Sequence, residues 1–423
     1  MLDVKAIRED PEPFRSALAR RKLADAVDEI LTADERRRSL TTRVEELRAE
    51  QNRASKAIGR ARDEEKRALI AEVGKVSAEL KELEPQLAEA ERELEELLAR
   101  VPNVPHVSAP DGFTDEDAVE IRRHGEPPTF DFEPRDHVAL GELLGVLDTE
   151  RAVRASGSRF VYLLGDLVHV QFALVRHAMD VLTGKGFTPV IPPVLVRDEA
   201  MYGTGFLPTD EVNLYVTRED ELYLVGTSEV PLAAFRMGEI IEEPELPLRY
   251  AGYSTCFRRE AGTYGKDMSG MFRVHQFDKV EMFSFTRPED SWDEHESMVS
   301  VEEEIVQRLG LPYRVVNIAA GDLGGAAAKK YDIEVWLPSQ GRYRELTSCS
   351  NCTDYQARRL QTRVRRADGR IEILHTLNGT ATAIGRTLIA ILENHQRADG
   401  SVALPGALHP YLPVGLRELR PPA

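Results

Sequence analysis

Two heptad stretches near the N-terminus constrain the fold of this 423-residue chain more than any other feature. Apolar side chains recur at alternating spacings of four and three residues from Leu40 to Ile58, and again from Val76 to Leu97. This rhythm is typical of helices that pack along a narrow apolar seam. The stretches are broken only at residues 59–63, so the second helix must fold back on the first. The sequence predicts an antiparallel two-helix coiled coil over about residues 27–100, which projects as an arm or lies along another surface.

The two predicted helices carry opposite charges. The return helix is rich in glutamate, whereas the outgoing helix is rich in arginine. This is either ordinary coiled-coil surface charge or a basic stripe that contacts phosphates. The candidates for phosphate contact are Arg36, Arg37, Arg43, Arg48 and Arg53.

Residues 101–134 separate this helical part from the rest of the chain. They are rich in proline and show no sustained period, which is typical of a linker at a domain boundary. We expect a helical domain at residues 1–105, a linker at 106–134 and a second domain at 135–423. Beyond the linker, strands are joined by hairpins and long insertions, which favours an α+β fold with an antiparallel sheet. Helices are predicted at residues 163–182, 291–309 and 382–396, with Arg386 in the second turn of the last.

A charged hairpin is predicted at residues 249–285, as two strands joined by a polar loop with Gly262, Gly265 and Gly270. In its second strand the period of two places five side chains on one face. They are Arg273, His275, Phe277, Lys279 and Glu281. So many charges are costly to bury unless they hold a ligand, and the alternative is a solvated face with cross-strand ion pairs.

Composition limits the class of protein. No apolar run reaches the roughly 18 residues that a membrane span needs, and the first residues lack a signal-peptide pattern. Three cysteines argue against a disulfide framework and for a reducing compartment, so a cytoplasmic location is expected. The net charge of -17 does not exclude a nucleic-acid partner, because binding depends on local patches.

Three signatures in order resemble those of the class II aminoacyl-tRNA synthetases. Gly186-Phe187-x-x-Val190-x-x-Pro193 resembles motif 1, which builds the dimer interface in that family. Motif 2 is matched by Phe257-Arg258-Arg259-Glu260 together with Arg273-Val274-His275-Gln276-Phe277. Motif 3 is matched by Ala383-Ile384-Gly385-Arg386.

Three further stretches are similar to those of the seryl-tRNA synthetases. They are Thr227-Ser228-Glu229, Glu345-Leu346-Thr347-Ser348-Cys349-Ser350-Asn351-Cys352 and Thr376-Leu377-Asn378-Gly379-Thr380-Ala381. The resemblance implies ATP-dependent activation of L-serine to seryl-adenylate and its transfer to the 3′ end of tRNA(Ser), and of tRNA(Sec) where one exists. It also implies a homodimer through the motif 1 region and an N-terminal arm that grips the long variable arm of the tRNA.

The resemblance assigns roles to single residues. Arg258 matches the arginine that faces the α-phosphate, Arg386 the arginine that faces the γ-phosphate, and Glu260 and Phe277 the adenine contacts. The implied ATP-binding set is Arg258, Arg259, Glu260, Arg273, Val274, Phe277, Glu345, Leu346, Thr347, Ser348 and Arg386, of which Arg258, Glu260 and Arg386 are the catalytic candidates. The implied serine-binding set is Thr227, Ser228, Glu229, Glu281, Asn378 and Thr380. The implied Mg²⁺ ligands are Glu345 and Ser348, which offer hard oxygens.

Several residues have a second interpretation. Cys349-x-x-Cys352 has the spacing of a zinc or redox pair, but only Cys256 is left to complete a ligand set, so no zinc is expected. His275 is interpreted as a structural member of the hairpin. Gly324-Gly325 lacks the Lys-Ser/Thr of a P-loop and is interpreted as a turn that enters a helix.

Two other functions compete with the synthetase hypothesis. One is a ligase that loads an amino acid onto a carrier protein, and the long arm argues against it. The other is a coiled-coil interaction protein with an inactive synthetase domain, and the intact set of charged motif residues argues against that.

Overall fold

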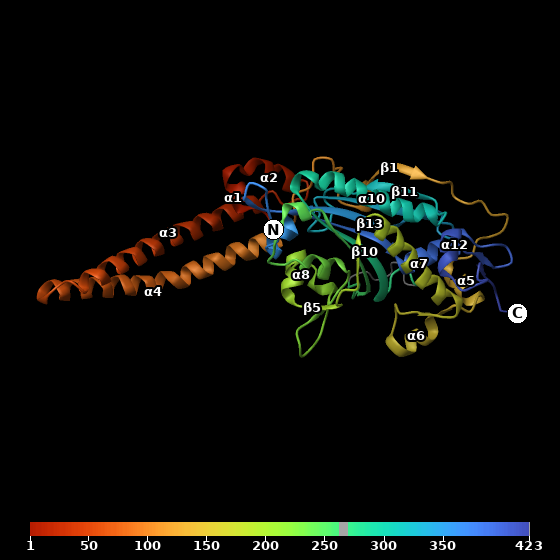
Figure 1. Cartoon of the computed structure of the whole chain (residues 1–423), viewed down its shortest axis with the longest axis horizontal. Helices are drawn as coiled ribbons and strands as arrows, with labels where there is room; N and C mark the ends of the chain where they lie inside the picture. Colours follow the sequence, from red (N-terminus) through yellow and green to blue (C-terminus); the bar gives the residue numbers. More distant parts are fainter. Residues whose placement is uncertain (262–269, 423) are drawn as a thin grey trace. The chain divides into compact units, whose positions relative to one another are not determined.

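The computed structural model describes residues 1–261 and 270–422, so the part of the motif 2 loop that contains Gly262 and Gly265 lies outside the described residues. By its internal contacts the chain forms two compact units, Met1–Val104 and Pro105–Ala423 (Figure 1). Each unit has its own buried side chains and is described by itself.

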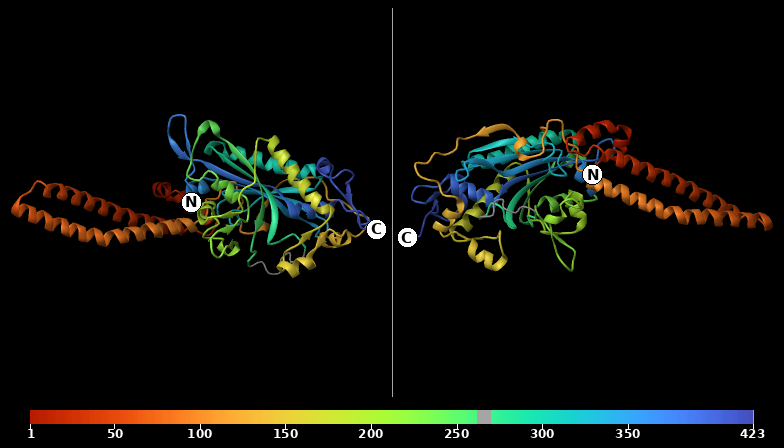
Figure 2. Two further views of the ribbon diagram at one scale, coloured as in Figure 1. Left: turned by 60° about the horizontal axis from the view of Figure 1, so that its bottom comes forward. Right: turned by 180° about the vertical axis from the view of Figure 1, so that it is seen from behind.

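The first unit is entirely helical in its described part. Its helices are α1 (Val4–Glu9), α2 (Pro11–Ala19), α3 (Ala26–Ile58) and α4 (Asp63–Arg100). Helices α3 and α4 run antiparallel as a long pair (Figure 2). Val44 and Leu47 on α3 pack against Val76 and Leu80 on α4. These are heptad positions, so the predicted coiled-coil hairpin is confirmed.

The second unit is built on a twisted sheet that has eight strands among the described residues, in the order β1-β11-β12-β13-β16-β10-β9-β4. All neighbours pair antiparallel except β4 and β9, which are parallel. The antiparallel α+β class predicted from the sequence is therefore confirmed. The strands are β1 (Val119–His124), β4 (Thr188–Val190), β9 (Leu248–Phe257), β10 (Gln276–Thr286), β11 (Tyr313–Asn317), β12 (Lys329–Leu337), β13 (Arg342–Thr353) and β16 (His375–Ala383).

Three long helices pack on the sheet and on one another. They are α7 (Asp166–Gly184), α10 (Ser291–Arg308) and α12 (Ile384–Asn394). Between them and the central strands lies the largest apolar core, which includes Leu174, Val280, Met282 and Leu388. A second apolar cluster lies under α9 (Glu229–Ala234) and α11 (Tyr355–Leu360) and contains Phe283 and Phe285.

The remaining elements are short. The helices are α5 (His137–Leu143), α6 (Thr149–Ser156) and α8 (Asp198–Thr204). The strands are β2 (Leu147–Asp148), β3 (Tyr162–Leu163), β5 (Leu195–Val196), β6 (Tyr215–Val216), β7 (Tyr223–Leu224), β8 (Ile240–Glu242), β14 (Arg363–Arg365), β15 (Ile371–Ile373), β17 (Val402–Ala403) and β18 (Glu418–Leu419). Single-turn 3₁₀ helices are η1 (Asp115–Asp117), η2 (Glu211–Asn213), η3 (Glu243–Glu245) and η4 (Pro288–Asp290), and a longer one is η5 (Gly406–Tyr411). In the described part of the chain, no helix is long and apolar enough to cross a membrane.

Three sequence-based expectations differ from the structure. The expected linker at residues 106–134 contributes the edge strand β1, whose side chains are all exposed and so give no apolar period. Gly324-Gly325 leads into strand β12 and not into a helix. Helix α12 begins at Ile384, so Arg386 lies in its first turn and not in its second.

Strand β1 bears two ion pairs that make a matched test, one to a nearly buried carboxylate and one to a more exposed carboxylate. Arg122 binds both carboxylate oxygens of Glu303, which is nearly buried and also accepts a hydrogen bond from Tyr313. Arg123 binds the more exposed Glu120. We predict that Arg122→Ala lowers the free energy of unfolding of this unit by about 2–3 kcal/mol, because Glu303 would stay buried without its cation.

Urea denaturation followed by tryptophan fluorescence measures this change, because Trp292 and Trp336 are the only tryptophans and both belong to the second unit. The control is Arg123→Ala, for which about 0.5 kcal/mol is expected. Equal losses in the two variants would contradict the interpretation.

Candidate functional site

The register of β10 determines which motif residues meet. On one side Glu281 pairs with Gly252 of β9, and on the other side it pairs with Thr380 of β16. Between Val280 and Glu281 the pairing with β16 shifts by one residue, which is a β-bulge. Bulges of this kind re-aim side chains beside active sites. Motif 2, the serine motif on β16 and the start of motif 3 therefore converge on one region of the sheet.

A polar cavity opens at this region and gathers the predicted ATP-binding residues. Its wall includes all of them except Arg259. Motif 2 contributes Arg258, Glu260, Arg273, Val274 and Phe277, strand β13 contributes Glu345, Leu346, Thr347 and Ser348, and helix α12 contributes Arg386. Arg259 is exposed, and its backbone N–H donates to Asn213 O at 2.9 Å. Lys279 and Phe272 also line the cavity, although the sequence analysis gave them no role there.

Arg258 is held so that its guanidinium group faces the cavity. Its Nε donates to the carbonyl of Gly226 at 3.2 Å, and its guanidinium carbon lies 5.4 Å from the centre of the Phe277 ring. The backbone N–H of Arg258 donates to the carbonyl of His275, whose own ring Nδ1 lies 2.8 Å from the carbonyl of Arg258. These contacts join His275 to the backbone of the first strand, which agrees with its interpretation as a structural member of the hairpin. They also fix a cation where an anionic ligand enters.

Glu260 has a strained backbone that a neighbouring segment supports. Its φ is +51°, a left-handed conformation that glutamate rarely adopts. Asn213 accepts hydrogen bonds from the two residues that flank Glu260. The carbonyl of Asn213 accepts from the N–H of Arg259, and its Oδ1 accepts from the N–H of Ala261, both at 2.9 Å. The Glu260 carboxylate is paired with Arg273 at 2.5 Å. Sequence reasoning missed Asn213, because it is distant in the chain and belongs to no motif.

Glu345 and Arg386 form an ion pair inside the same cavity. Arg386 Nη1 lies 3.1 Å from Glu345 Oε2, and it also donates to the carbonyl of Glu345 at 3.0 Å. Burial alone would raise the pKa of Glu345, but the charges of Arg386 and Lys330 lower that pKa to about 2. The guanidinium of Arg386 also packs on Phe272, at 4.9 Å from the ring centre. An ionised carboxylate beside the Ser348 hydroxyl suits a hard cation such as Mg²⁺.

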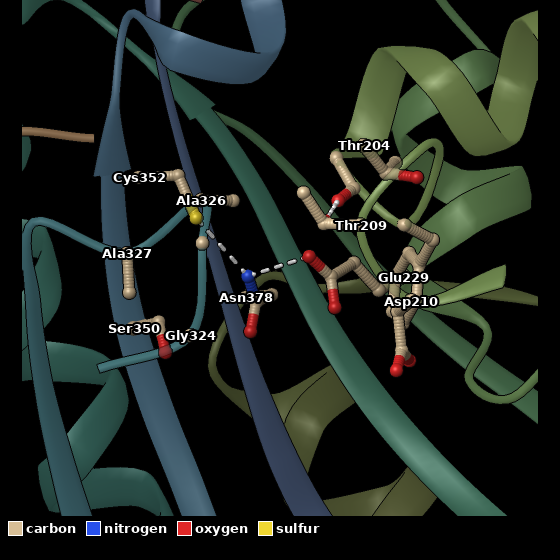
Figure 3. A pocket seen from close by; sticks show the side chains of 13 residues that line it. Thr204, Thr209, Asp210, Glu229, Gly324, Ala326, Ala327, Ser350, Cys352 and Asn378 are labelled. Atoms are coloured by element: carbon tan, nitrogen blue, oxygen red, sulfur yellow. Dashed lines mark hydrogen bonds between the residues drawn. The ribbon is translucent and has the colours of Figure 1, made fainter. Parts of the chain in front are cut away.

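A second cavity adjoins the serine motif (Figure 3). Glu229, at the start of α9, accepts hydrogen bonds at Oε1 from Asn378 Nδ2 at 2.9 Å and from Gln356 Nε2 at 2.7 Å. Burial and the nearby charge of Glu281 raise the pKa of Glu229 to about 7. Sequence analysis did not indicate the other walls, which are Thr204, Gly205, Phe206, Thr209, Asp210, Gly324, Gly325, Ala326, Ala327, Ser350 and Cys352.

The other predicted serine-binding residues differ in the hydrogen-bond partners of their side chains. Thr380 donates to Glu281 Oε2 at 3.2 Å. Thr227 is buried, and its hydroxyl accepts from the backbone N–H of Glu229 at 3.2 Å. Ser228 is fully buried and its hydroxyl contacts the Gly252 carbonyl and the Ser254 hydroxyl. That geometry places Ser228 between α9 and β9, and like Thr227 and Glu281 it lines neither cavity.

The three cysteines are free thiols inside the protein. Burial raises the pKa of all three, which keeps them protonated at neutral pH. Cys352 accepts a hydrogen bond from Asn378 Nδ2 at 3.4 Å (Figure 3). Among the described residues, no group of three or more histidine, cysteine, aspartate or glutamate side chains is arranged to hold a metal ion.

Four of the five arm arginines are already paired with acidic side chains of their own unit. Arg36 contacts Glu93, Arg43 contacts Glu79 and Arg48 contacts Glu84, each across the hairpin. Arg37 contacts Asp34 on its own helix. Arg53 is exposed, and no ion pair to it occurs within the described residues. The three pairs across the hairpin are exposed, and such pairs are weak and exchange readily for other anions, whereas Asp34, the partner of Arg37, is buried.

Comparison with known proteins gives two family matches. Residues 1–105 match the seryl-tRNA synthetase N-terminal domain, and residues 213–395 match the class II tRNA synthetase core domain (G, H, P, S and T). The serine--tRNA ligase of Streptomyces coelicolor is 50% identical over 100% of this chain and 99% of its own length. That of Thermobifida fusca is also 50% identical, over the same shares.

Solved structures agree with these matches. Seryl-tRNA synthetase from Pyrococcus horikoshii, complexed with ATP, superposes with a TM-score of 0.93 at 43% identity over the whole of both chains. Cytoplasmic serine--tRNA ligase from Naegleria fowleri, in complex with AMP, gives 0.89 at 35% identity over 100% of this chain and 99% of that one. Giardia lamblia prolyl-tRNA synthetase shares the fold alone, with a TM-score of 0.57 at 16% identity over 64% of this chain and 55% of that one. The chain therefore belongs to the seryl-tRNA synthetase family within the class II aminoacyl-tRNA synthetases.

Proposed function

We propose that this protein joins L-serine to tRNA(Ser), and to tRNA(Sec) where the cell makes one, in two steps in the cytoplasm. The serine carboxylate attacks the α-phosphorus of ATP and displaces pyrophosphate, which forms seryl-adenylate. A ribose hydroxyl at the 3′ end of the tRNA then attacks the acyl carbon and displaces AMP. The observation that carries the proposal is the gathering of ten predicted ATP-binding side chains on one cavity wall in a chain of this family.

The first step needs little beyond positioning and electrostatic stabilisation, because the nucleophile is already a carboxylate. We assign Arg258 to the α-phosphate, where negative charge builds in the transition state and a fixed guanidinium is most effective. Phe277 offers its ring to adenine, and Glu260 accepts from the adenine amino group. Arg386 is assigned to the γ-phosphate. Glu345 and Ser348 would hold Mg²⁺, which neutralises phosphate charge when bound.

Serine is selected by the polar side chains on the serine side of the site. Glu281 and Thr227 are assigned to the α-ammonium group, and Glu229, Asn378 and Thr380 to the region of the side-chain hydroxyl. A site built to pair a hydroxyl rejects an analogue without it by on the order of 10⁴-fold, because its own polar groups would remain unpaired. Alanine is excluded in this way.

The arm and the motif 1 region are assigned to macromolecular contacts. We assign the arm to the tRNA: Arg53 meets phosphate directly, whereas Arg36, Arg37, Arg43 and Arg48 exchange their carboxylate partners for phosphates. We assign the motif 1 region to a homodimer. Phe172 on α7 is 58% exposed and Ile191 after β4 is 84% exposed in the single chain, and a second copy would cover such apolar side chains.

Arg258→Ala tests the assignment of the α-phosphate. We predict that serine-dependent ATP–pyrophosphate exchange falls by roughly 10²–10³-fold or more, because one fixed transition-state donor is lost. Arg287→Ala is the matched control, because Arg287 directly follows Thr286, the last residue of β10, and forms only surface ion pairs. Exchange near the wild-type rate in Arg258→Ala would refute the mechanism.

The raised pKa of Glu229 predicts that serine activation depends on pH. Since its pKa is raised to about 7, the carboxylate takes up a proton as the pH falls below that value and loses its attraction for serine. We predict that kcat/KM for serine, which reports the free enzyme, declines toward tenfold per pH unit below about pH 7. Glu229→Gln is neutral at every pH, so it should show a low value without this decline. A decline of the same shape in Glu229→Gln would assign it to another group.

Replacing residues 38–91 with a short glycine-rich turn tests the arm. The cut is placed where Arg36 of α3 lies beside Glu93 of α4, so the two helices can be rejoined. We predict that serine-dependent ATP–pyrophosphate exchange stays within about threefold of the wild type, whereas kcat/KM for charging tRNA(Ser) falls by at least about 100-fold, because the phosphate contacts are lost. Charging that survives the replacement would show that the arm has another role.

A further inference from the structure

Lys279 lines the proposed ATP cavity and forms a buried ion pair with Glu281, which itself lines neither of the two cavities described above. Lys279 Nζ lies 2.5 Å from Glu281 Oε2, and the two side chains are only 8% and 2% exposed. The same oxygen accepts the hydrogen bond from Thr380. Within the described residues, no hydrogen bond reaches the other oxygen, Oε1. The carboxylate therefore has one occupied oxygen and one open oxygen.

We propose that Lys279 is a positioning residue for serine: it binds Oε2 of Glu281, so that Oε1 is presented to the α-ammonium group of the substrate. This inference rests on the proposed function and adds a residue to it. Lys279 acts on the substrate through Glu281 and is not itself assigned to the reacting atoms.

The surroundings of Glu281 explain why it needs a cation of its own. A buried carboxylate without a positive partner takes up a proton, and a neutral acid attracts an ammonium group poorly. Three acidic groups face this region, Glu229 from α9, Glu302 from α10 and Cys256 from β9, and the charge of Glu281 adds to burial in raising the pKa of each. Burial raises the pKa of Glu302 well above its usual value, as it does for Glu229.

The cations near Glu281 are not interchangeable. Arg258 also acts electrostatically on this region, but its Nε is bound to Gly226 and its guanidinium packs on Phe277. Lys279 is the cation in direct contact, two residues from Glu281 on the same strand and therefore on the same face. Lys279 also lines the cavity. A purely structural ion pair could lie anywhere in the core, whereas Lys279 of this pair lines the cavity together with Thr380, which also binds Glu281.

The test compares four variants with the wild type in ATP–pyrophosphate exchange at pH 7, with the concentrations of L-serine and ATP varied in turn. They are Lys279→Met, Lys279→Arg, Glu281→Gln and the double variant Lys279→Met/Glu281→Gln. We expect Lys279→Met to raise the serine KM by roughly 10- to 100-fold at pH 7, with the ATP KM within about threefold. Lys279→Arg should restore most of the serine affinity.

The double variant separates positioning from an unrelated structural role. If Lys279 acts through Glu281, the double variant loses no more than Glu281→Gln alone. Losses that multiply in the double variant, or a loss in Lys279→Met that falls equally on the serine KM and the ATP KM, would overturn the inference. If Lys279→Met does not fold, as judged by thermal melting, the comparison rests on Lys279→Arg, and a serine KM as poor as that of Glu281→Gln would overturn it. A wild-type protein without serine-dependent exchange would instead refute the proposed function.

Discussion

The pairing of β10 between β9 and β16 is the constraint on which the site depends. Because side chains alternate along a strand, a slip of one residue would turn every functional side chain of β10 to the opposite face. The apolar residues Val280 and Met282 are fully buried in the core, which fixes the register. The same register then leaves Phe277, Lys279 and Glu281 on the cavity side. The apolar core and the polar site are thus two consequences of one pattern of alternation.

The sequence predicted this arrangement well where function depends on residues close together in the chain. The period of two in the charged hairpin placed Arg273, Phe277 and Glu281 on one face, and the structure brings Arg273 and Phe277 to one cavity wall. The heptad spacing predicted the coiled coil because a helix pair needs only a local repeat. The motif order predicted the family, which the comparisons confirm.

The sequence could not predict features that depend on tertiary contacts. The sequence did not identify Glu281 as the partner of Lys279, because an alternating pattern places side chains on one face but does not show which of them form pairs. Strand β1 was missed because an exposed edge strand has no apolar period. The turn at Gly324 was expected to enter a helix, whereas it leads into β12 and forms part of the second cavity, because glycine and alanine carry little information about tertiary position. The ion pairs along the arm depend on how α3 and α4 are aligned, and the heptads alone leave that alignment open.

The support of Glu260 by Asn213 has a consequence for both substrates. The segment that carries Asn213 also contains Phe206 and Asp210, and these two residues line the cavity beside Glu229 as well as the cleft beside Arg258 and Glu260. One short stretch of chain is therefore a shared wall of the two neighbouring cavities. A ligand that shifts this wall on one side changes its shape on the other, and thermodynamic reciprocity requires the effect to be equal in both directions. Ligands of these two cavities that shift this wall are therefore linked, and their affinities have to be measured each in the presence of the other.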